Sequence, residues 1–379
     1  MTARQGSTFV RSGCFPSNEP AAPCGADVPI TICGPSERRR TVSADHAETD
    51  APVIHTWEYG QFRSELRQNE VIYDVDPHRG VARIIFNRPH RLNSIPLAGF
   101  DYVTKLVKRA ERDDAVHMIL FEGNGPCFGT GADASELGRY VGYGDTDASG
   151  RAGRPSQRRR MIPDRDILFG THGVEQAVFR CFKPTVVKAH GYCYGGHLQI
   201  ALAADIVIAG DSATFTHPAW RYLGPIFNFD LLIEAVGLRK AKEMVLTARP
   251  VGAAEAEQSG LITKAVPDAD LDRWVDDYLS ALSVMPRDGI AVGKAMMEQV
   301  LDARGAAVGS GAAWIGHGWI TNLRFESDEW NFLRARRDHG LTEALRLRDQ
   351  MVPEYFRMAQ RPGPDRAGSA GAGPDPGSE

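Results

Sequence analysis

The stretch GYCYGGHLQIALAADIVIAG, residues 191–210, decides the fold of this chain. It begins as a glycine-rich turn, continues as a short helix and ends as an apolar strand. A turn of this kind leaves the first amides of the helix without acceptors inside the helix, so these amides can point toward a bound oxygen. The first helical turn carries Gln199, an amide that does not titrate, where a carboxylate would act as a general acid or base.

A second glycine turn, CFGTGADASEL at residues 127–137, also follows an apolar strand and precedes a helix. Two such turns can hold one carbonyl oxygen between two amides. They would then stabilise the negative charge that develops when a thioester becomes an enolate or a tetrahedral adduct. Glycine turns before helices also serve the close packing of helix against strand, and for either turn alone this structural interpretation stays open.

Composition and charge narrow the class of protein. With 379 residues, 42% of them hydrophobic, the chain can bury a full core in one large or two modest domains. A net charge of -4 and a pI near 6.3 exclude the global basic field of a dedicated nucleic-acid binder. The six cysteines form no CxxC pair and no zinc-like spacing, which favours free thiols in a reducing compartment. No signal peptide or membrane-spanning run is evident, so we expect a cytoplasmic protein.

The organisation along the chain predicts an α/β fold. Residues 1–55 and 361–379 are rich in Pro, Gly, Ser and charge, and we expect a flexible leader and a disordered tail there. Between them the apolar period alternates between two and 3.6, which predicts a core over 56–285 and a helical C-terminal region over 286–360. The predicted strands are 71–76, 81–87, 116–123, 185–191 and 205–210. The predicted helices follow Pro96 and cover 166–182, 196–204 and most of 229–358.

Residues 138–165 interrupt this pattern with several glycines and seven arginines. We expect a loop there, either a solvated surface excursion or a segment that grips an anionic substrate.

Taken together with IIFNRPHRLNSI at residues 84–95, the two glycine turns resemble the crotonase superfamily, the enoyl-CoA hydratase/isomerase-like enzymes. Asn87, Arg88, Pro89 and Asn93 match the NRP...N signature of that family. The resemblance covers about residues 70–300. It implies a spiral of ββα units with a helical C-terminal region, assembled as a homotrimer or hexamer, and an acyl-CoA substrate with no separate cofactor, no metal and no nucleic acid or membrane partner.

The resemblance also assigns roles to residues of the two turns. It implies that the amides of Ala132 and Gly196 form the oxyanion hole, with Gly131 and Gly195 beside them. Arg91 stands where the family often has a basic residue near the CoA phosphates. Three further residues are candidates for lining the substrate pocket: Tyr140, Trp220 and Asn228.

The carboxylates of the family hydratases are missing from this sequence. Those enzymes place one glutamate in the first turn after the second oxyanion glycine, where this chain has Gln199, and another about twenty residues later. The second position falls on Ala219 or Trp220, depending on the register, and neither is an acid. Hydration needs one group to take a proton from water and one to protonate the α carbon, so simple hydration is not expected.

His217 and Asp230 are the candidates for handling protons instead. His217 lies just after the predicted strand SATF, close to the second missing glutamate, and an imidazole titrates near neutral pH. Asp230 lies a few residues after Gly224, where several relatives place a reactive polar group. The alternative for Asp230 is the N-cap of the helix that follows, and for His217 a hydrogen-bonded strand end.

The sequence therefore predicts a crotonase-like enzyme that stabilises a thioester enolate and uses it for chemistry other than simple hydration. Decarboxylation, hydrolysis of a C–C bond or related lyase chemistry stay open. The alternatives are an ordinary enoyl-CoA hydratase/isomerase with relocated acid and base groups, a cyclic diketone hydrolase that does without CoA, and a non-catalytic relative that binds RNA.

Overall fold

The computed structural model describes residues 51–59, 62–136, 157–170, 172–221, 224, 228–319 and 324–357. The chain divides into two compact units, Met1–Val42 and Ser43–Glu379, and all the described residues belong to the second unit. In these residues no helix is both long and apolar enough to cross a membrane.

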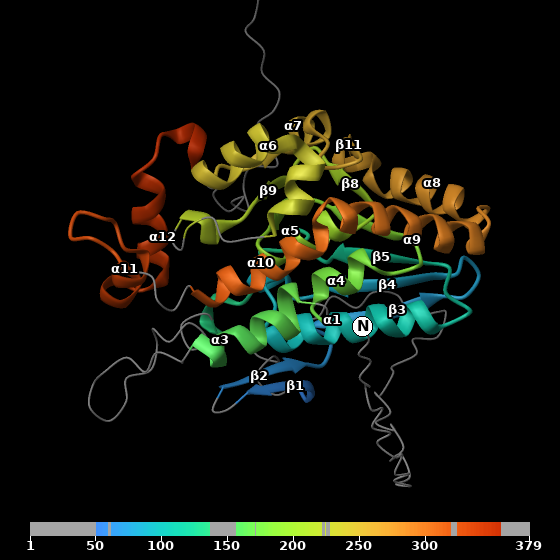
Figure 1. Cartoon of the computed structure of the whole chain (residues 1–379), viewed down its shortest axis with the longest axis horizontal. Coiled ribbons are helices and arrows are strands. Elements are labelled where there is room, and N and C mark those ends of the chain that lie inside the picture. Colours follow the sequence, from blue (N-terminus) through green and yellow to red (C-terminus); the bar gives the residue numbers. More distant parts are fainter. Residues whose placement is uncertain are drawn as a thin grey trace, which may run out of the picture. The chain divides into compact units, whose positions relative to one another are not determined.

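A six-stranded sheet forms the centre of the fold, in the order β11-β8-β6-β5-β4-β3 (Figure 1). β3 is antiparallel to β4, and the other neighbouring pairs are parallel. Strands are therefore found at all five predicted positions, and the α/β class is confirmed. The six strands are β3 (Val71–Asp76), β4 (Val81–Phe86), β5 (Met118–Gly123), β6 (Thr185–Ala189), β8 (Ile206–Gly210) and β11 (Lys264–Val266).

Both faces of this sheet are buried because its side chains alternate between two apolar clusters. In β5, Ile119 and Phe121 join the larger cluster with α1 (Leu97–Arg112), whereas Met118 and Leu120 join the cluster under α8 (Leu271–Ser283). Parallel strands covered on both faces read as continuous apolar runs, as β5 does.

A smaller three-stranded sheet positions the second glycine turn. It contains β7 (Tyr192–Tyr194), β9 (Thr214–Thr216) and β10 (Val251–Gly252), in the order β10-β9-β7. The chain passes from β6 to β7 at Gly191, whose φ is +56° and whose added Cβ would lie 2.3 Å from the carbonyl oxygen of Pro126. Only glycine adopts this conformation without strain at so close an approach.

The predicted helix at 166–182 is in fact two segments. A π-helix, η2 (Asp164–Phe169), ends at Gly170, and α4 (Val174–Phe179) begins after Gly173. A Cβ on Gly170 would lie 2.1 Å from the carbonyl oxygen of Arg165. The chain turns sharply where apolar periodicity alone predicts continuity.

The N-terminal boundary also differs from the prediction. β1 (Val53–Tyr59) begins inside the segment predicted to be a flexible leader, and it pairs antiparallel with β2 (Phe62–Arg67). α1 packs against both strands, and Leu66 of β2 is fully buried. β1 therefore begins three residues before the predicted boundary, because a period-two pattern over residues 53–55 alone is too short to stand out from the polar leader.

Residues 229–358 are mostly helical, as predicted, and β10 and β11 are the two strands within them. α6 is kinked at Gly237, where φ is +73°. The helices here, besides α8, are α6 (Phe229–Thr247), α7 (Ala253–Ser259), η4 (Asp268–Asp270), α9 (Arg287–Arg304), α10 (Ala306–Gly318), α11 (Phe332–His339), α12 (Leu341–Gln350) and η6 (Glu354–Phe356).

Arg221 attaches the end of this region to the core. It closes the short helix η3 (Pro218–Arg221), and its side chain is 9% exposed. The guanidinium donates to the carbonyl oxygens of Thr247 and Ala248, at 3.1 and 3.3 Å, and to that of Phe356. One side chain thus joins η3, the end of α6 and the last described helix.

Replacing Arg221 with alanine is expected to lower the free energy of unfolding by about 3 kcal/mol, because buried carbonyls lose a charged donor. Urea titration of the full chain measures this. Arg337→Ala is the matched control: that side chain is 71% exposed and pairs only with its neighbour Asp338, so a change of at most about 0.5 kcal/mol is expected. Equal stability losses in the two variants would contradict the role given to Arg221.

Candidate active site

The first glycine turn lies between two neighbouring chain segments. On one side, the amide of Gly129 donates to the carbonyl of Tyr192 at 2.8 Å. On the other side, Ile95 donates to the carbonyl of Gly131 at 3.0 Å and accepts from the amide of Asp133 at 2.8 Å. Because backbone groups alternate along an extended segment, the amide of Ala132 points away from Ile95.

The second glycine turn begins α5 (Gly196–Ala203). Gly195, with φ +60°, precedes the helix and donates its amide to the carbonyl of Thr216 at 3.1 Å. Gly196 is the first helical residue, and its amide has no acceptor within the helix. Among the hydrogen bonds of the described residues, none is donated by the amides of Gly196 or Ala132.

The two turns touch each other. A Cβ added to Gly131 would lie 2.9 Å from the amide nitrogen of Gly196 and 3.1 Å from Cα of Gly195. The free amides of Ala132 and Gly196 therefore belong to chain segments in direct contact. Two free amides so placed can both donate to a single oxygen atom.

His197 links the two glycine turns: it follows Gly196 in α5 and accepts a hydrogen bond from the first turn. Its Nδ1 accepts the amide of Gly131 at 3.0 Å, and its ring is enclosed by Phe86, Phe100 and Phe128. Burial lowers the pKa of this imidazole to about 3, so it stays neutral and keeps Nδ1 free to accept. Neutral His197 therefore has a structural role, since it fixes the amide of Gly131.

A network of polar side chains holds the first turn in place. Asn93 is fully buried, and its Nδ2 donates to the carbonyls of Asn124 and Cys127 at 2.9 and 2.7 Å. Arg88 donates to Asp133 at 3.0 Å, and Asp133 in turn accepts the amide of Ser135 at the start of the next helix. The residues of the NRP...N signature therefore act on the backbone of the turn.

Neither position of a family glutamate holds an acid. Gln199 lies in the first turn of α5 and is 2% exposed, and its Oε1 has no hydrogen-bond partner among the residues that the structure describes. Ala219 and Trp220 both lie in η3, and Trp220 is 4% exposed. A buried amide oxygen without a donor is costly, and it is available to a polar group that enters the site.

His217 stacks on Trp220, with ring centroids 5.6 Å apart. Burial, together with the nearby His317, lowers the pKa of His217 to about 3. At neutral pH the ring is therefore uncharged, and it is a weak base.

Asn228, and not Asp230, is the N-cap of α6. Its Oδ1 accepts the amide of Asp230 at 3.2 Å, which corrects the alternative given for Asp230. The carboxyl of Asp230 instead faces α10, where a Cβ added to Gly309 would lie 1.4 Å from its Oδ2. Burial raises its pKa, and so does the charge of Glu234.

Glu175 is the residue of this region that sequence reasoning missed. It lies in α4, is 1% exposed, and accepts Nδ2 of Asn228 at 2.7 Å. Burial is the main cause that raises the pKa of its carboxyl, hydrogen bonds from Asn228 and Gln176 lower it, and the charge of Asp230 adds to the rise. The resulting pKa is about 7. The sequence pattern that could have indicated Glu175 is a single acid close to two apolar residues, Val174 and Val178, which the structure shows to be buried.

Arg91 and Tyr140 are the remaining residues predicted for the site. Arg91 is exposed at the end of the short helix η1 (Pro89–Arg91). Tyr140 and most of the arginine-rich loop lie outside the described residues. Lys294, which is a weaker candidate for CoA binding, is buried and pairs with Asp205, an ordinary structural ion pair.

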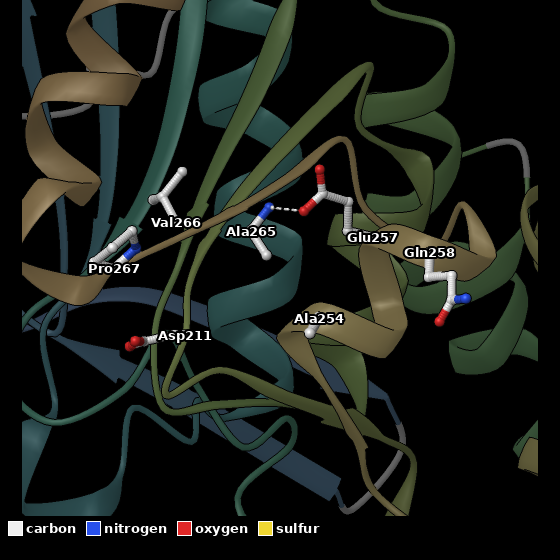
Figure 2. A pocket seen from close by; sticks show the side chains of 7 residues that line it. All are labelled: Asp211, Ala254, Glu257, Gln258, Ala265, Val266 and Pro267. Carbon is white, nitrogen blue, oxygen red and sulfur yellow. Dashed lines mark hydrogen bonds between the residues drawn. The ribbon is translucent and has the colours of Figure 1, made fainter.

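A cavity of about 620 Å³ lies apart from both turns, beside the edge strand β11 (Figure 2). Of its two acidic lining residues, Asp211 and Glu257, the carboxyl of Glu257 accepts the amide of Ala265 at 3.0 Å and Nζ of Lys264 at 2.7 Å. None of its lining residues belongs to a glycine turn. In the described parts of the chain, no group of three or more His, Cys, Asp or Glu side chains could hold a metal ion.

Comparison with known proteins gives matches over the same region. The family model described as enoyl-CoA hydratase/isomerase matches residues 76–311. A probable mitochondrial enoyl-CoA hydratase of Dictyostelium discoideum is 30% identical over 197 residues, 50% of this chain and 62% of the relative, so the chain spans less than two thirds of that protein. A 4-chlorobenzoyl coenzyme A dehalogenase of an Arthrobacter species is 30% identical over 215 residues, 56% of this chain and 72% of the relative.

A solved structure supports the same family assignment. The crystal structure of an enoyl-CoA hydratase of Mycobacterium smegmatis superposes with a TM-score of 0.60 at 28% identity, covering 74% of this chain and 93% of that one. The predicted crotonase-like fold with its helical C-terminal region is confirmed. With a family model matched over most of its described length and both glycine turns inside the match, the chain belongs to the enoyl-CoA hydratase/isomerase family, the crotonase superfamily.

Proposed function

We propose that this protein binds an acyl-CoA, polarises its thioester carbonyl between the amides of Ala132 and Gly196, and stabilises the resulting enolate. The observation that carries the proposal is the contact between the two turns, which brings two free backbone amides together. The relatives support a CoA thioester as substrate, because the names of the hydratase and the dehalogenase both specify one.

The reaction that we propose is not simple hydration. Gln199 and the pair Ala219 and Trp220 supply no carboxylate, so the two proton transfers of hydration lack the family groups. Decarboxylation fits better, because loss of carbon dioxide generates the enolate without a base, and one proton at the α carbon completes the reaction. Hydrolysis of a C–C bond next to the thioester is the second possibility of the same kind.

Within this proposal, Gln199 positions a polar group of the substrate through its unpartnered Oε1, and Trp220, which is 4% exposed, lines the substrate pocket. His217 is a poor proton carrier, because burial keeps its imidazole neutral and weakly basic. Asp230 is a better candidate, since its pKa is raised toward the working range.

A hydratase or isomerase with relocated groups is the alternative that a specific observation favours. Glu175 and Asp230 form a pair of carboxyl groups, and the pKa of each is raised. Two carboxyls of this kind are what hydration requires.

We also propose a cytoplasmic homotrimer or hexamer. Exposed apolar side chains on α9 support an assembly, since Val292, Met296 and Val300 recur at a spacing of four residues and are each at least 59% exposed.

Crotonyl-CoA separates the leading proposal from the alternative. The full chain is expected to bind CoA thioesters tightly, as isothermal calorimetry would show, and to leave the enoyl absorbance of crotonyl-CoA unchanged while releasing carbon dioxide from a malonyl-type thioester. Rapid decay of the absorbance would support the relocated hydratase, and failure to bind CoA would contradict both.

Gly131→Ala tests the oxyanion amides. The new Cβ would lie 2.9 Å from the amide nitrogen of Gly196 and φ at this position is +92°, so the turn must move. A fall in kcat of roughly 100-fold or more is expected, the effect of losing one oxyanion donor. Gly289→Ala, whose Cβ would meet its nearest neighbour at 3.7 Å, is the control and should leave kcat unchanged. Unaltered turnover in Gly131→Ala would exclude this site for the carbonyl.

A further inference from the structure

We propose that Glu175 transfers the proton to and from the α carbon of the bound thioester, and that Asn228 positions its carboxyl for this. The inference rests on the proposed enolate chemistry and assigns the proton carrier that the missing family glutamates leave open.

Glu175 is buried without a cation. Among the described residues its hydrogen-bond donors are two amides, Nδ2 of Asn228 at 2.7 Å and Nε2 of Gln176 at 3.4 Å, and no ion pair involves it. A buried carboxylate that lacks a positive partner is unfavourable for the fold. A glutamine at this position would accept the same hydrogen bond without that penalty, so the acid is not explained by packing.

The position of Glu175 connects it to the second glycine turn. α4, which carries Glu175, packs against α5, the helix that begins at Gly196 and carries Gln199 (Figure 1). α5 also packs against α6, whose N-cap Asn228 holds the carboxyl. The carboxyl of Glu175 is therefore held between α4 and α6, which both pack against α5. α5 supplies the free amide of Gly196.

A second carboxyl, that of Asp230, raises the pKa of Glu175. Asp230 follows Asn228 by two residues, and α10 approaches it so closely that a Cβ on Gly309 would lie 1.4 Å from Oδ2. Among the described residues, Asp230 is the one charged group that acts on Glu175, and α1, α5 and η2, which also pack against α4, add none. Two neighbouring carboxyls with raised pKa values are typical of acid–base sites.

The proposed step balances within this set of residues. The ionised carboxylate of Glu175 takes a proton from the α carbon, the electrons of that C–H bond form the C=C bond of the enolate, and the carbonyl electrons move onto the oxygen between the two amides. In the reverse direction, or after carbon dioxide has left, protonated Glu175 returns the proton to the carbon. A group with a pKa of about 7 has both forms present at neutral pH.

Exchange of the α protons of butyryl-CoA in D2O, followed by proton NMR, tests this inference. The wild-type chain is expected to catalyse exchange, and Glu175→Gln to lower the rate at least 100-fold while binding the thioester with unchanged affinity. Glu298→Gln is the matched control, since Glu298 is also a buried acid with a raised pKa. It pairs with Arg180 and, among the described residues, has no hydrogen bond to Glu175 or Asn228, so this variant should exchange as the wild type does. Normal exchange in Glu175→Gln would overturn the inference.

The pH profile distinguishes proton transfer from a merely structural role. The exchange rate should rise with pH to an inflection near 7, because the carboxylate is the active form. Asn228→Ala removes a bond that favours the ionised form and should move the inflection up, whereas Asp230→Asn removes a repelling charge and should move it down. Shifts in the same direction, or none, would contradict the assignment.

Stability gives an independent readout. Because the folded-state pKa is raised from 4.5 to about 7, the folded chain holds the extra proton between these values, and the ionisation penalty appears as pH rises through them. The stability of Glu175→Gln relative to the wild type should therefore increase from about pH 4.5 and level off above about pH 7. A loss of stability at neutral pH would mean that the acid serves the fold.

Failure of the inference is separable from failure of the proposed function. No binding of butyryl-CoA would overturn both. Tight binding without exchange in the wild type would overturn the role of Glu175 and leave the thioester site standing.

Discussion

The close approach of two backbone turns is the constraint on which the rest of the structure depends. Gly131 and Gly196 are so near that no Cβ fits between them, and this contact exists only because three segments meet there. β7 holds the first turn on one side, Ile95 holds it on the other, and Thr216 fixes Gly195 from β9. A displacement in any of these would separate the two free amides, since hydrogen bonds to a common oxygen tolerate only a few tenths of an ångström.

The polar groups around the turns support the backbone, and their ionisation states follow from burial. His197 remains neutral so that it can accept an amide, and Asn93 satisfies two carbonyls that would otherwise be orphaned. The charged residues Arg88 and Asp133 neutralise each other next to the turn. In the proposed oxyanion site, dipoles that are already oriented would therefore hold the transient negative charge, which is the least costly way to do so.

Acid and base groups are less tightly tied to the fold than the amides are. A carboxyl can reach one reaction centre from different helices, because a side chain spans several ångströms, whereas an amide is fixed by its strand or turn. In this chain the two family positions are without acids, and Glu175 and Asp230 stand on α4 and α6, the two helices that pack against α5. The C-terminal helices contribute as well, since Gly309 of α10 contacts Asp230 and Arg221 joins η3 to η6.

The sequence by itself determined the alternation of strands and helices, both glycine turns and the loss of the family glutamates. These are local features: apolar period and glycine spacing are set by residues close together in the chain. The break at Gly170, the hairpin of β1 and β2 and the N-cap at Asn228 are local too, but apolar periodicity does not encode them. Each depends on a backbone geometry, such as the close approach of Gly170 to the carbonyl of Arg165. Only the tertiary structure brought Glu175 to Asn228, 53 positions apart, and only burial among apolar side chains gave that carboxyl its raised pKa.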